Sequence, residues 1–584
     1  MQLQTHIRER FHQLERAASR TQAATRRITR WHRRAPDVHE LLLMPPDLRP
    51  ADPSFAAELA AGQMGLAGAV ADFGAGSPFD VRAPSEAWAR ELAGFGWLRH
   101  LDAARDGAGP ILAGRLFAAW LDRGGAAHPI AAAPVVLARR LAAWLAHAGL
   151  MLDGVDVRSQ RKFLAALRAA TTRLARIWDR AEPGTPRVVA LATLIAAYLA
   201  FPDGDAERIR FEAELVRALD ATVLPDGGLV CRNPAALLDL LLDLIPLRQC
   251  YLVRGLAPPP RLTAAVSAMS AMLRHLRLGC GALARFNGTG VTDRAGLATV
   301  LAIDEGRQRA WTQARESGFV RLAAGPAVLM LDAGAAPPVP VSRRAAAGCL
   351  SFELSIGRQP LIVNCGAPDL GHAQWLATAR ATTRHSTLSL AEASSAELRG
   401  AGADGREGTG VMAGPSRVLC ETASDASASI VAASHDGYLR RFGLLHRRTL
   451  RLDAAGTRLE GRDTLGPEHG TLRLAHDVPF AVHFHLHPDC APTPGVDGIG
   501  IDIELPNGAR WCFTAEGGVL SIEESVFLAT ETGPRASRQI VIRGACFGES
   551  ELQWSLAAVA GADVADADAM RAQELEPPGG KPTP

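Results

Sequence analysis

The chain has 584 residues, of which 48% are hydrophobic and 5% aromatic. This length exceeds what one hydrophobic core usually supports, so the sequence predicts two large domains. The formal net charge of +2 gives no indication of nucleic acid as a partner. The longest apolar run, residues 188–202, is too short to span a bilayer. We therefore expect a buried helix there and no transmembrane segment.

The two ends of the chain differ in composition from the rest. Residues 1–80 begin with a basic, amphipathic stretch, which predicts a solvated or a membrane-surface helix followed by a linker. No hydrophobic segment with a small-residue cleavage site follows, so the sequence by itself supports a cytoplasmic location. Residues 561–584 are acidic and then rich in Pro and Gly, which predicts a disordered tail.

Residues 81–318 have apolar side chains mostly at the i, i+3, i+4 spacing of amphipathic helices. Two successive candidates occupy roughly 40 to 50 residues, a spacing typical of stacked helical hairpins. The predicted helices are Ile111–Asp122, Ala133–Leu150, Arg158–Arg180, Pro186–Phe201, Ala206–Thr222, Pro234–Arg254, Pro260–Leu278 and Asp293–Gln308.

Residues 319–560 change to a period of two, with many short apolar runs separated by turn residues. Such a pattern predicts an antiparallel β-sandwich. The domain boundary is expected at Ser317–Arg321, where the period changes. The fold class predicted for the whole chain is α+β and multidomain.

Several short motifs carry a family resemblance. Between Val328 and Leu390 the chain reads G-C-L-S-F-E-L, P-L-I-V-N-C-G and R-x-T-x-x-H-S-T-L. F-G-W-L-R-H-L, L-P-D-G-G and F-H-L-H-P occur elsewhere in matching order. In these motifs the chain resembles the heparinase II/III family, whose members are polysaccharide lyases. The resemblance implies an incomplete α/α toroid followed by a β-sandwich, and it implies work in the periplasm or cell envelope.

A polysaccharide lyase removes the proton beside a uronate carboxyl group and expels the 4-linked oxygen. It needs a base, an acid and donors that neutralise the carboxylate. Active family members place a catalytic His after the D-G motif, where this chain has Leu237. Arg232 and Asn233 remain there and could bind an anionic group. Alternatively, Asn233 only caps the helix that begins at Pro234.

The second family site uses a Tyr, and no Tyr precedes the corresponding loop, residues 281–288. Arg285 and Asn287 lie in that loop and either face the groove of the toroid or form a turn. Tyr251 is a conceivable substitute for the missing Tyr. An aromatic residue in an apolar helix is, however, more often part of the core.

The third family site lies in the β-domain, where related lyases can hold zinc. The corresponding residues here are Ala346, Asn364 and His385, so two ligand types are absent and we predict no metal. His385 is then either a catalytic imidazole or a packed interface residue. The nine cysteines show no C-x-x-C spacing, so neither a disulfide framework nor a zinc ribbon is indicated.

Three further histidines, His483, His485 and His487, alternate along a predicted strand and are expected to point to one face. Imidazoles at this spacing can chelate a metal. The corresponding strand of the family usually has a structural role, so both interpretations stand.

Two functions follow from the resemblance. The first is a polysaccharide lyase that cleaves an acidic, uronate-containing glycan by β-elimination without a cofactor. Its catalytic residues would be His385, Tyr251 and Asn233, and Arg232, Arg285 and Asn287 would bind the substrate. The second is a non-catalytic or differently catalytic relative that binds an acidic glycan in cell-envelope or capsule metabolism. Fold alone does not decide between them, and the sequence leaves the oligomeric state open.

Overall fold

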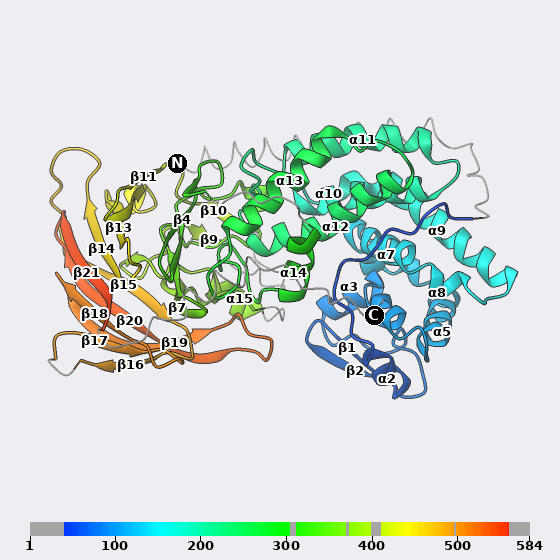
Figure 1. Cartoon of the computed structure of the whole chain (residues 1–584), viewed down its shortest axis with the longest axis horizontal. Coiled ribbons are helices and arrows are strands. Elements are labelled where there is room, and N and C mark those ends of the chain that lie inside the picture. The colour runs from blue at the N-terminus through cyan, green and yellow to red at the C-terminus, as the bar shows by residue number, and fades with distance from the viewer. Residues whose placement is uncertain (1–39, 304–310, 369–372, 399–409, 496–497, 560–584) are drawn as a thin grey trace, which may run out of the picture.

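The structure is a computed structural model that describes residues 40–303, 311–368, 373–398, 410–495 and 498–559. Figure 1 shows a helical part at one end of an elongated molecule and a β-part at the other. This arrangement confirms the predicted α+β fold, a partial α/α toroid followed by a β-sandwich. The basic N-terminal stretch up to residue 39 and the tail at residues 561–584 lie outside the described residues.

The helical part contains one long series of helices, preceded by a small hairpin of strands β1 (Gln63–Leu66) and β2 (Ala69–Asp72). Short 3-10 turns follow α5 and α9. The helices are α2 (Phe55–Ala60), α3 (Glu86–Gly94), α4 (Leu98–Ala103), α5 (Gly109–Asp122), α6 (Pro129–Ala132), α7 (Pro134–Ala146), α8 (Gly149–Leu152), α9 (Val157–Ile177), α10 (Thr185–Ala200), α11 (Asp205–Asp220), α12 (Pro234–Val253), α13 (Pro260–His275) and α14 (Arg294–Ile303).

Helix α10 is the centre of this part. Every residue from Val188 to Ala200 is buried, and α7, α11 and α12 pack around it. This confirms the buried helix expected from the apolar run at residues 188–202. None of the described helices combines the length and hydropathy that crossing a membrane requires.

Helix α12 links the centre of the toroid to the β-part. Pro234 occupies its first turn, where a missing N–H costs nothing, and Asn233 is the cap residue before it. Pro246 lies inside the helix, although proline removes one backbone hydrogen bond there. Pro246 is buried, and the helix continues through it to Val253.

The β-part begins at Gln313 and contains two large sheets and small accessory elements. The short helices are α15 (Ala373–Ala379) and α16 (Leu439–Phe442). The strands are β3 (Gln313–Ala314), β4 (Phe319–Ala324), β5 (Ala327–Asp332), β6 (Phe352–Ile356), β7 (Gln359–Val363), β8 (Leu388–Leu390), β9 (Glu397–Leu398), β10 (Val411–Ala413), β11 (Val418–Ser424), β12 (Ala428–His435), β13 (Leu445–Asp453), β14 (Arg458–Gly466), β15 (Val478–Leu486), β16 (Ala491–Pro494), β17 (Ile501–Glu504), β18 (Arg510–Glu516), β19 (Val519–Phe527), β20 (Arg535–Cys546) and β21 (Ser550–Ala558).

All pairings in the two large sheets are antiparallel. One sheet has the order β11-β12-β13-β14-β21-β18-β17-β16. The other has the order β19-β20-β15-β7-β6-β5-β4-β3, and β8 pairs with β15 beside this path. Strand β13 alternates strictly between buried and half-buried residues, as a strand with one face on a core requires.

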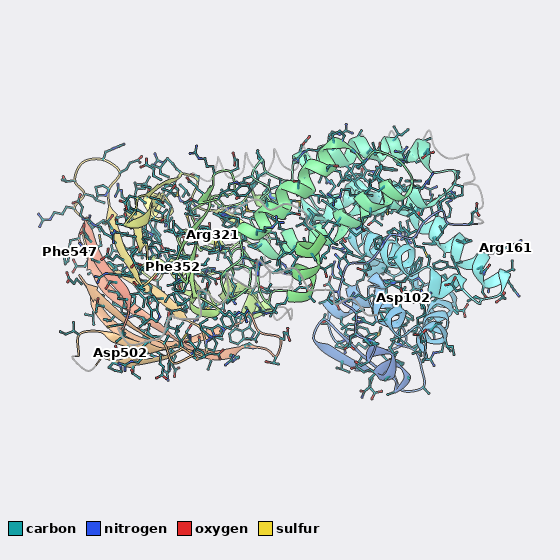
Figure 2. The ribbon with its side chains drawn as sticks, viewed as in Figure 1. Asp102, Arg161, Arg321, Phe352, Asp502 and Phe547 are labelled. Atoms are coloured by element: carbon teal, nitrogen blue, oxygen red, sulfur yellow. The ribbon has the colours of Figure 1, made fainter. Side chains whose placement is uncertain are left out.

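The core of the sandwich lies between these sheets. Phe352 of β6 stacks on Trp554 of β21 with 5.8 Å between ring centroids, and Phe484 meets the same indole edge-on at 4.8 Å. Figure 2 shows Phe352 inside the β-part, whereas Phe547 lies at its far end. The helical core, in contrast, continues into the first strands, because Phe319 and Met330 pack with the buried residues of the helices.

The D-G motif helps to fasten the two parts together. The carboxylate of Asp226 accepts hydrogen bonds from Ser317 N at 2.7 Å and Ser317 Oγ at 2.9 Å. Gly227 has a φ of +84°, and a Cβ there would lie 2.0 Å from the carbonyl oxygen of Ala268. Only glycine therefore fits this turn without displacing the backbone.

The sequence placed most elements but missed some boundaries. The expected helix Ala133–Leu150 is divided into α7 and α8, because the backbone leaves helical geometry at His147. Helix α3 was not predicted, since it is short and is followed by the glycines of the F-G-W motif. The β-part starts at Gln313, a few residues before the expected change of period.

Candidate functional site

The candidate residues gather where the N-terminus of α12 meets the first strands of the β-part. Asn233 caps α12, and its Oδ1 accepts a hydrogen bond from Ala236 N at 3.0 Å. The hydroxyl of Thr289 donates to the same oxygen at 3.1 Å. Asn233 is 6% exposed, so its amide is a cap that also ties the helix to the neighbouring loop. Leu237, at the position of the family His, is buried in the helix.

The side chain of Arg232 binds other residues of the same chain. Its backbone is left-handed, with φ of 55°, and the side chain is 7% exposed. The guanidinium forms an ion pair with Asp332, and its Nε donates to Ser317 O at 2.7 Å. It also lies over the ring of Phe319, 4.9 Å from the centroid. The charge of Arg232 is therefore neutralised and desolvated at the junction.

Asn287 completes this network from the loop after α13. Its Nδ2 donates to Asp332 Oδ2 at 3.3 Å, so the carboxylate of Asp332 bridges Arg232 and Asn287. The other end of the amide, Oδ1, accepts from Ala346 N at 3.3 Å. Asn287 thus binds the loop in which the family zinc ligand would stand, and Ala346 contributes only its backbone.

Arg285 forms a second buried ion pair, with Glu353 of β6. The Nη1–Oε2 distance is 3.3 Å, and Glu353 is fully buried. Burial raises the pKa of the Glu353 carboxyl group, although Arg285 and the N–H of Asn364 act in the opposite direction. Asn364 N donates to Glu353 Oε1 at 2.8 Å. Arg285, like Arg232, is therefore paired with a carboxylate of the same chain.

His385 is held as an oriented imidazole. Its Nδ1 is 2.9 Å from Ala381 O, which requires the proton to be on that nitrogen. Burial lowers the pKa of His385, although Asp332 acts in the opposite direction, so the ring is neutral at pH 7. The unprotonated Nε2 has no hydrogen bond to a described residue. Gly348 packs against the ring, and a Cβ there would lie 2.6 Å from Cδ2.

Tyr251 lies elsewhere. Asn233 and Tyr251 are at opposite ends of α12, about 27 Å apart at 1.5 Å per residue. The Tyr251 hydroxyl donates to Glu212 Oε1 at 2.6 Å, and burial raises its pKa further above the ordinary value. The structure therefore brings together Arg232, Asn233, Arg285, Asn287 and His385 at the junction and leaves Tyr251 between α11 and α12.

The expected zinc position has no ligand set. Asn364 Oδ1 accepts from Ser386 N at 2.9 Å, and Ala346 has no ligating atom in its side chain. In the described part of the chain, no group of three or more His, Cys, Asp or Glu side chains is arranged to hold a metal ion. The absence of zinc stays a prediction, to be measured as metal content after dialysis against a chelator.

The three strand histidines are packed and hydrogen-bonded. His483 and His485 are buried and stack with 6.0 Å between ring centroids, which confirms that they share a face. His483 bonds Ser389 Oγ and Gln539 Oε1, each at 3.1 Å. Burial lowers the pKa of His483 to about 4 and that of His485 well below its usual value. His487 lies beyond the end of β15, with its ring 5.1 Å from that of Phe527.

Sequence reasoning missed the two acids that control the junction. Asp332 ends strand β5, and Glu353 lies within strand β6, in which every residue is buried. A carboxylate in a run such as C-L-S-F-E-L is itself a signal, because a buried acid needs a partner. The partners are distant in sequence, so only the folded chain identifies them.

Comparison with known proteins identifies the family of this chain. Residues 306–555 match the family described as heparinase II/III-like, C-terminal. FtsZ-localized protein C of Caulobacter vibrioides is 30% identical over 544 residues, covering 89% of this chain and 91% of the relative. The chain belongs to the heparinase II/III-like family.

Solved structures resemble this chain over almost its whole length. Heparinase III superposes with a TM-score of 0.69 at 12% identity, covering 91% of this chain and 88% of that one. A mutant heparan sulfate lyase from Pedobacter heparinus gives a TM-score of 0.62 at 14% identity, covering 89% and 86%. At such identities the likeness concerns the fold alone.

Proposed function

We propose that this chain is a non-catalytic member of the heparinase II/III-like family that works in the cell envelope and localises with FtsZ. The observation that carries the proposal is the pairing of both candidate arginines with buried carboxylates of the chain. A lyase needs free cations or amides to neutralise a uronate carboxylate, and freeing either arginine would leave an unpaired buried charge.

The proton-transfer groups support the same proposal. His385 is one imidazole at the junction, but a lyase also needs a group that protonates the leaving oxygen. The chain has three tyrosines. Tyr251 bonds Glu212, Tyr438 donates to Leu388 O at 2.8 Å, and Tyr198 is buried in α10. The localisation with FtsZ is carried over from the relative, whose likeness spans almost the full length of both chains.

The catalytic part is tested with purified protein and a panel of uronate polymers. We expect no rise in the ultraviolet absorbance of an unsaturated product, with heparinase III as the active control. Product formation from any polymer would contradict the proposal. Retention on the same immobilised polymers tests binding of an acidic glycan, the partner expected from the sequence.

The localisation is tested in cells with a fluorescent fusion and labelled FtsZ. We expect the two signals to coincide and the fusion to disperse when FtsZ is depleted. A fusion whose distribution is indifferent to FtsZ depletion would refute this part and leave the catalytic part standing.

One observation favours a lyase as the second candidate. The tautomer of His385 leaves Nε2 unprotonated in a neutral, oriented ring, which is the state that a general base requires. If the polymer panel reveals activity, His385→Ala should reduce turnover by at least about a hundredfold, the scale of a positioned base. A variant that folds and keeps full activity would exclude His385 as that base.

A further inference from the structure

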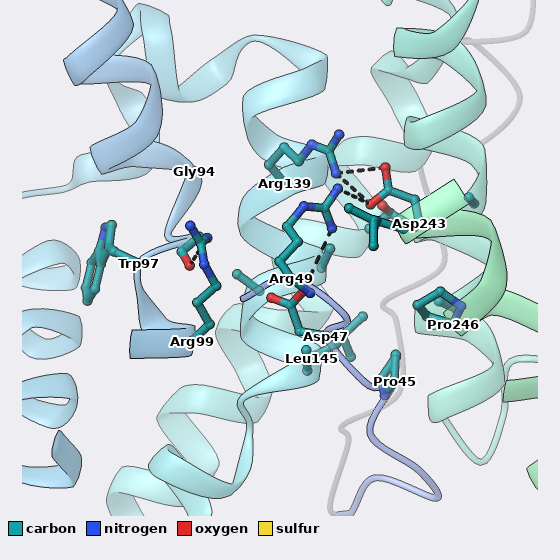
Figure 3. Close-up of a pocket in the computed structure, with 18 of the residues that line it drawn as sticks. Pro45, Asp47, Arg49, Gly94, Trp97, Arg99, Arg139, Leu145, Asp243 and Pro246 are labelled. Atoms are coloured by element: carbon teal, nitrogen blue, oxygen red, sulfur yellow. Dashed lines mark hydrogen bonds and ion pairs between the residues drawn. The ribbon is translucent and has the colours of Figure 1, made fainter. Parts of the chain in front are cut away.

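A cavity of about 440 Å³ lies within the helical part, away from the junction (Figure 3). Its walls come from the segment Pro45–Arg49, the loop after α3, and helices α7, α10 and α12. Most of the lining is apolar, with Trp97, Leu145 and Pro246 among its members. None of the six candidate residues discussed above lines it. The volume suits a small molecule.

Two of the arginines at this cavity are neutralised. Arg139 Nη1 is 2.6 Å from Asp243 Oδ1, and Arg49 Nη2 is 3.0 Å from the same oxygen. Both guanidinium groups also pair with Asp239, one turn before Asp243 in α12. Figure 3 shows Arg49 and Arg139 converging on Asp243. These four groups balance each other and leave no net charge for a ligand.

Arg99 is different. Its Nε donates to Pro50 O at 3.0 Å and its Nη1 to Gly96 O at 2.7 Å, so two carbonyl oxygens fix the guanidinium at the cavity. Among the described residues, no carboxylate lies within hydrogen-bonding or ion-pairing distance of it. Burial, the largest cause, lowers the pKa of Arg99, and Arg49 lowers it further. The carboxylates of Asp47, Glu91 and Asp293 act in the opposite direction without contacting it. Nη2 has no hydrogen bond to a described residue.

The guanidinium of Arg99 is half-buried and is in contact with no carboxylate of the described residues. An anion from solution therefore has both a fixed positive charge to pair with and access to it. The fixed guanidinium of Arg99 also has N–H groups without a hydrogen bond to a described residue. Their geometry suits the paired oxygens of a carboxylate or phosphate.

We propose that this cavity binds a small molecule whose single anionic group, a carboxylate or a phosphate, pairs with Arg99. The rest of the molecule packs on Trp97 and the apolar faces of α7 and α12. Asp47, Glu91 and Asp243 also line the cavity, so a second negative group would be repelled, and hydroxyl groups could donate to these carboxylates. The site is independent of the function proposed above.

Binding is measured with the full chain at constant ionic strength, using inorganic phosphate, D-glucuronate and uncharged D-glucose as probes. We expect saturable calorimetric binding and a rise in Tm with at least one anion, and neither with glucose. Which anion binds identifies the head group. Absence of binding by both anions at millimolar concentration, or equal binding of glucose, would overturn the proposal.

Variants assign the binding to this cavity. Arg99→Gln removes the charge and is expected to weaken anion binding by at least about tenfold. Arg123→Gln is the matched control, because Arg123 is an exposed arginine paired with Asp80 outside the cavity. Unchanged affinity in Arg99→Gln would refute the assignment. If Arg99→Gln does not fold, Ala142→Leu, which fills the cavity from α7, must abolish binding for the proposal to stand.

Discussion

Arg232 and Asp332 lie where the last turn before α12 meets the end of β5, and neither side chain is more than 8% exposed. Each neutralises the other. Asn287 donates to Asp332, and Arg232 donates to the carbonyl oxygens of Ser317, Gly334 and Ala335. A buried pair of this kind adds little net stability, but breaking it leaves a charge without a partner. Its role is to fix how the helical part meets the β-part.

Arg232→Met should therefore destabilise the protein strongly. The change leaves Asp332 buried and unpaired, which costs about 3–5 kcal/mol in the free energy of unfolding. Urea denaturation followed by circular dichroism measures the effect. The double variant Arg232→Met with Asp332→Leu should recover part of the loss, because it removes both charges.

The matched control is Arg123→Met, whose partner Asp80 is 49% exposed. Water replaces that partner readily, so we expect the unfolding midpoint to stay nearly unchanged. Equal, small effects of the two substitutions would mean that the charge of Arg232 is hydrated in solution. The function proposed for this chain would then lose its main support.

At the scale of a single element, strand β15 contains histidines whose imidazoles stay neutral near pH 7, because their pKa values are lowered. His483 and His485 alternate with apolar residues, and the partners around them are neutral: Ser389, Gln539 and Ser525. Burial is the main cause of their lowered pKa values. The strand therefore contributes packing and hydrogen bonds as long as its rings stay neutral.

The pH dependence of stability follows from these shifts. His483 has a pKa of about 4 in the folded chain against 6.5 unfolded, so the unfolded chain takes up the proton first. The stability that His483 contributes is complete above pH 6.5 and is lost as the pH falls toward 4. The linked slope is about 1 kcal/mol per pH unit for one such histidine.

We expect His483→Gln to flatten the acid limb of a plot of unfolding free energy against pH by about that slope. Denaturant titrations between neutral pH and about pH 4 measure it. His469→Gln serves as the control, since its side chain is 91% exposed. An acid limb as steep in His483→Gln as in the native chain would show that this ring is hydrated.

At the scale of the whole molecule, the helical and β-parts share one packed boundary. The rings of Phe286 and Phe319 stack with 5.6 Å between centroids, one from each part. Arg321 of β4 donates to His275 O at the end of α13 at 3.3 Å. Figure 2 places Arg321 at the side of the β-part that faces the helices. The two parts are therefore coupled by apolar contact and by hydrogen bonds.

This coupling predicts that the two parts unfold together. Calorimetry should show one transition whose calorimetric and van't Hoff enthalpies agree, because separating the parts exposes a buried apolar boundary. Phe286→Ala should lower the Tm of that transition without dividing it. Two resolved transitions in the native chain would mean that the boundary is too weak to couple the parts.

The sequence by itself determined the fold class and most of the elements. Local periodicity carries this information, because a helix or strand that buries one face must repeat its apolar residues at 3.6 or 2. The buried helix α10 and the alternating strand β13 were readable for this reason. The motifs also identified the family, and the residues they marked lie at one junction, with the exception of Tyr251.

Only the tertiary structure decided what those residues do. Arg232 and Asp332 are 100 positions apart, and Arg285 and Glu353 are 68 apart. Whether an arginine faces a ligand or a buried carboxylate depends on such distant pairs, which no local pattern records. The cavity at Arg99 was hidden for the same reason, since its walls come from segments between Pro45 and Leu247 that meet only in the folded chain.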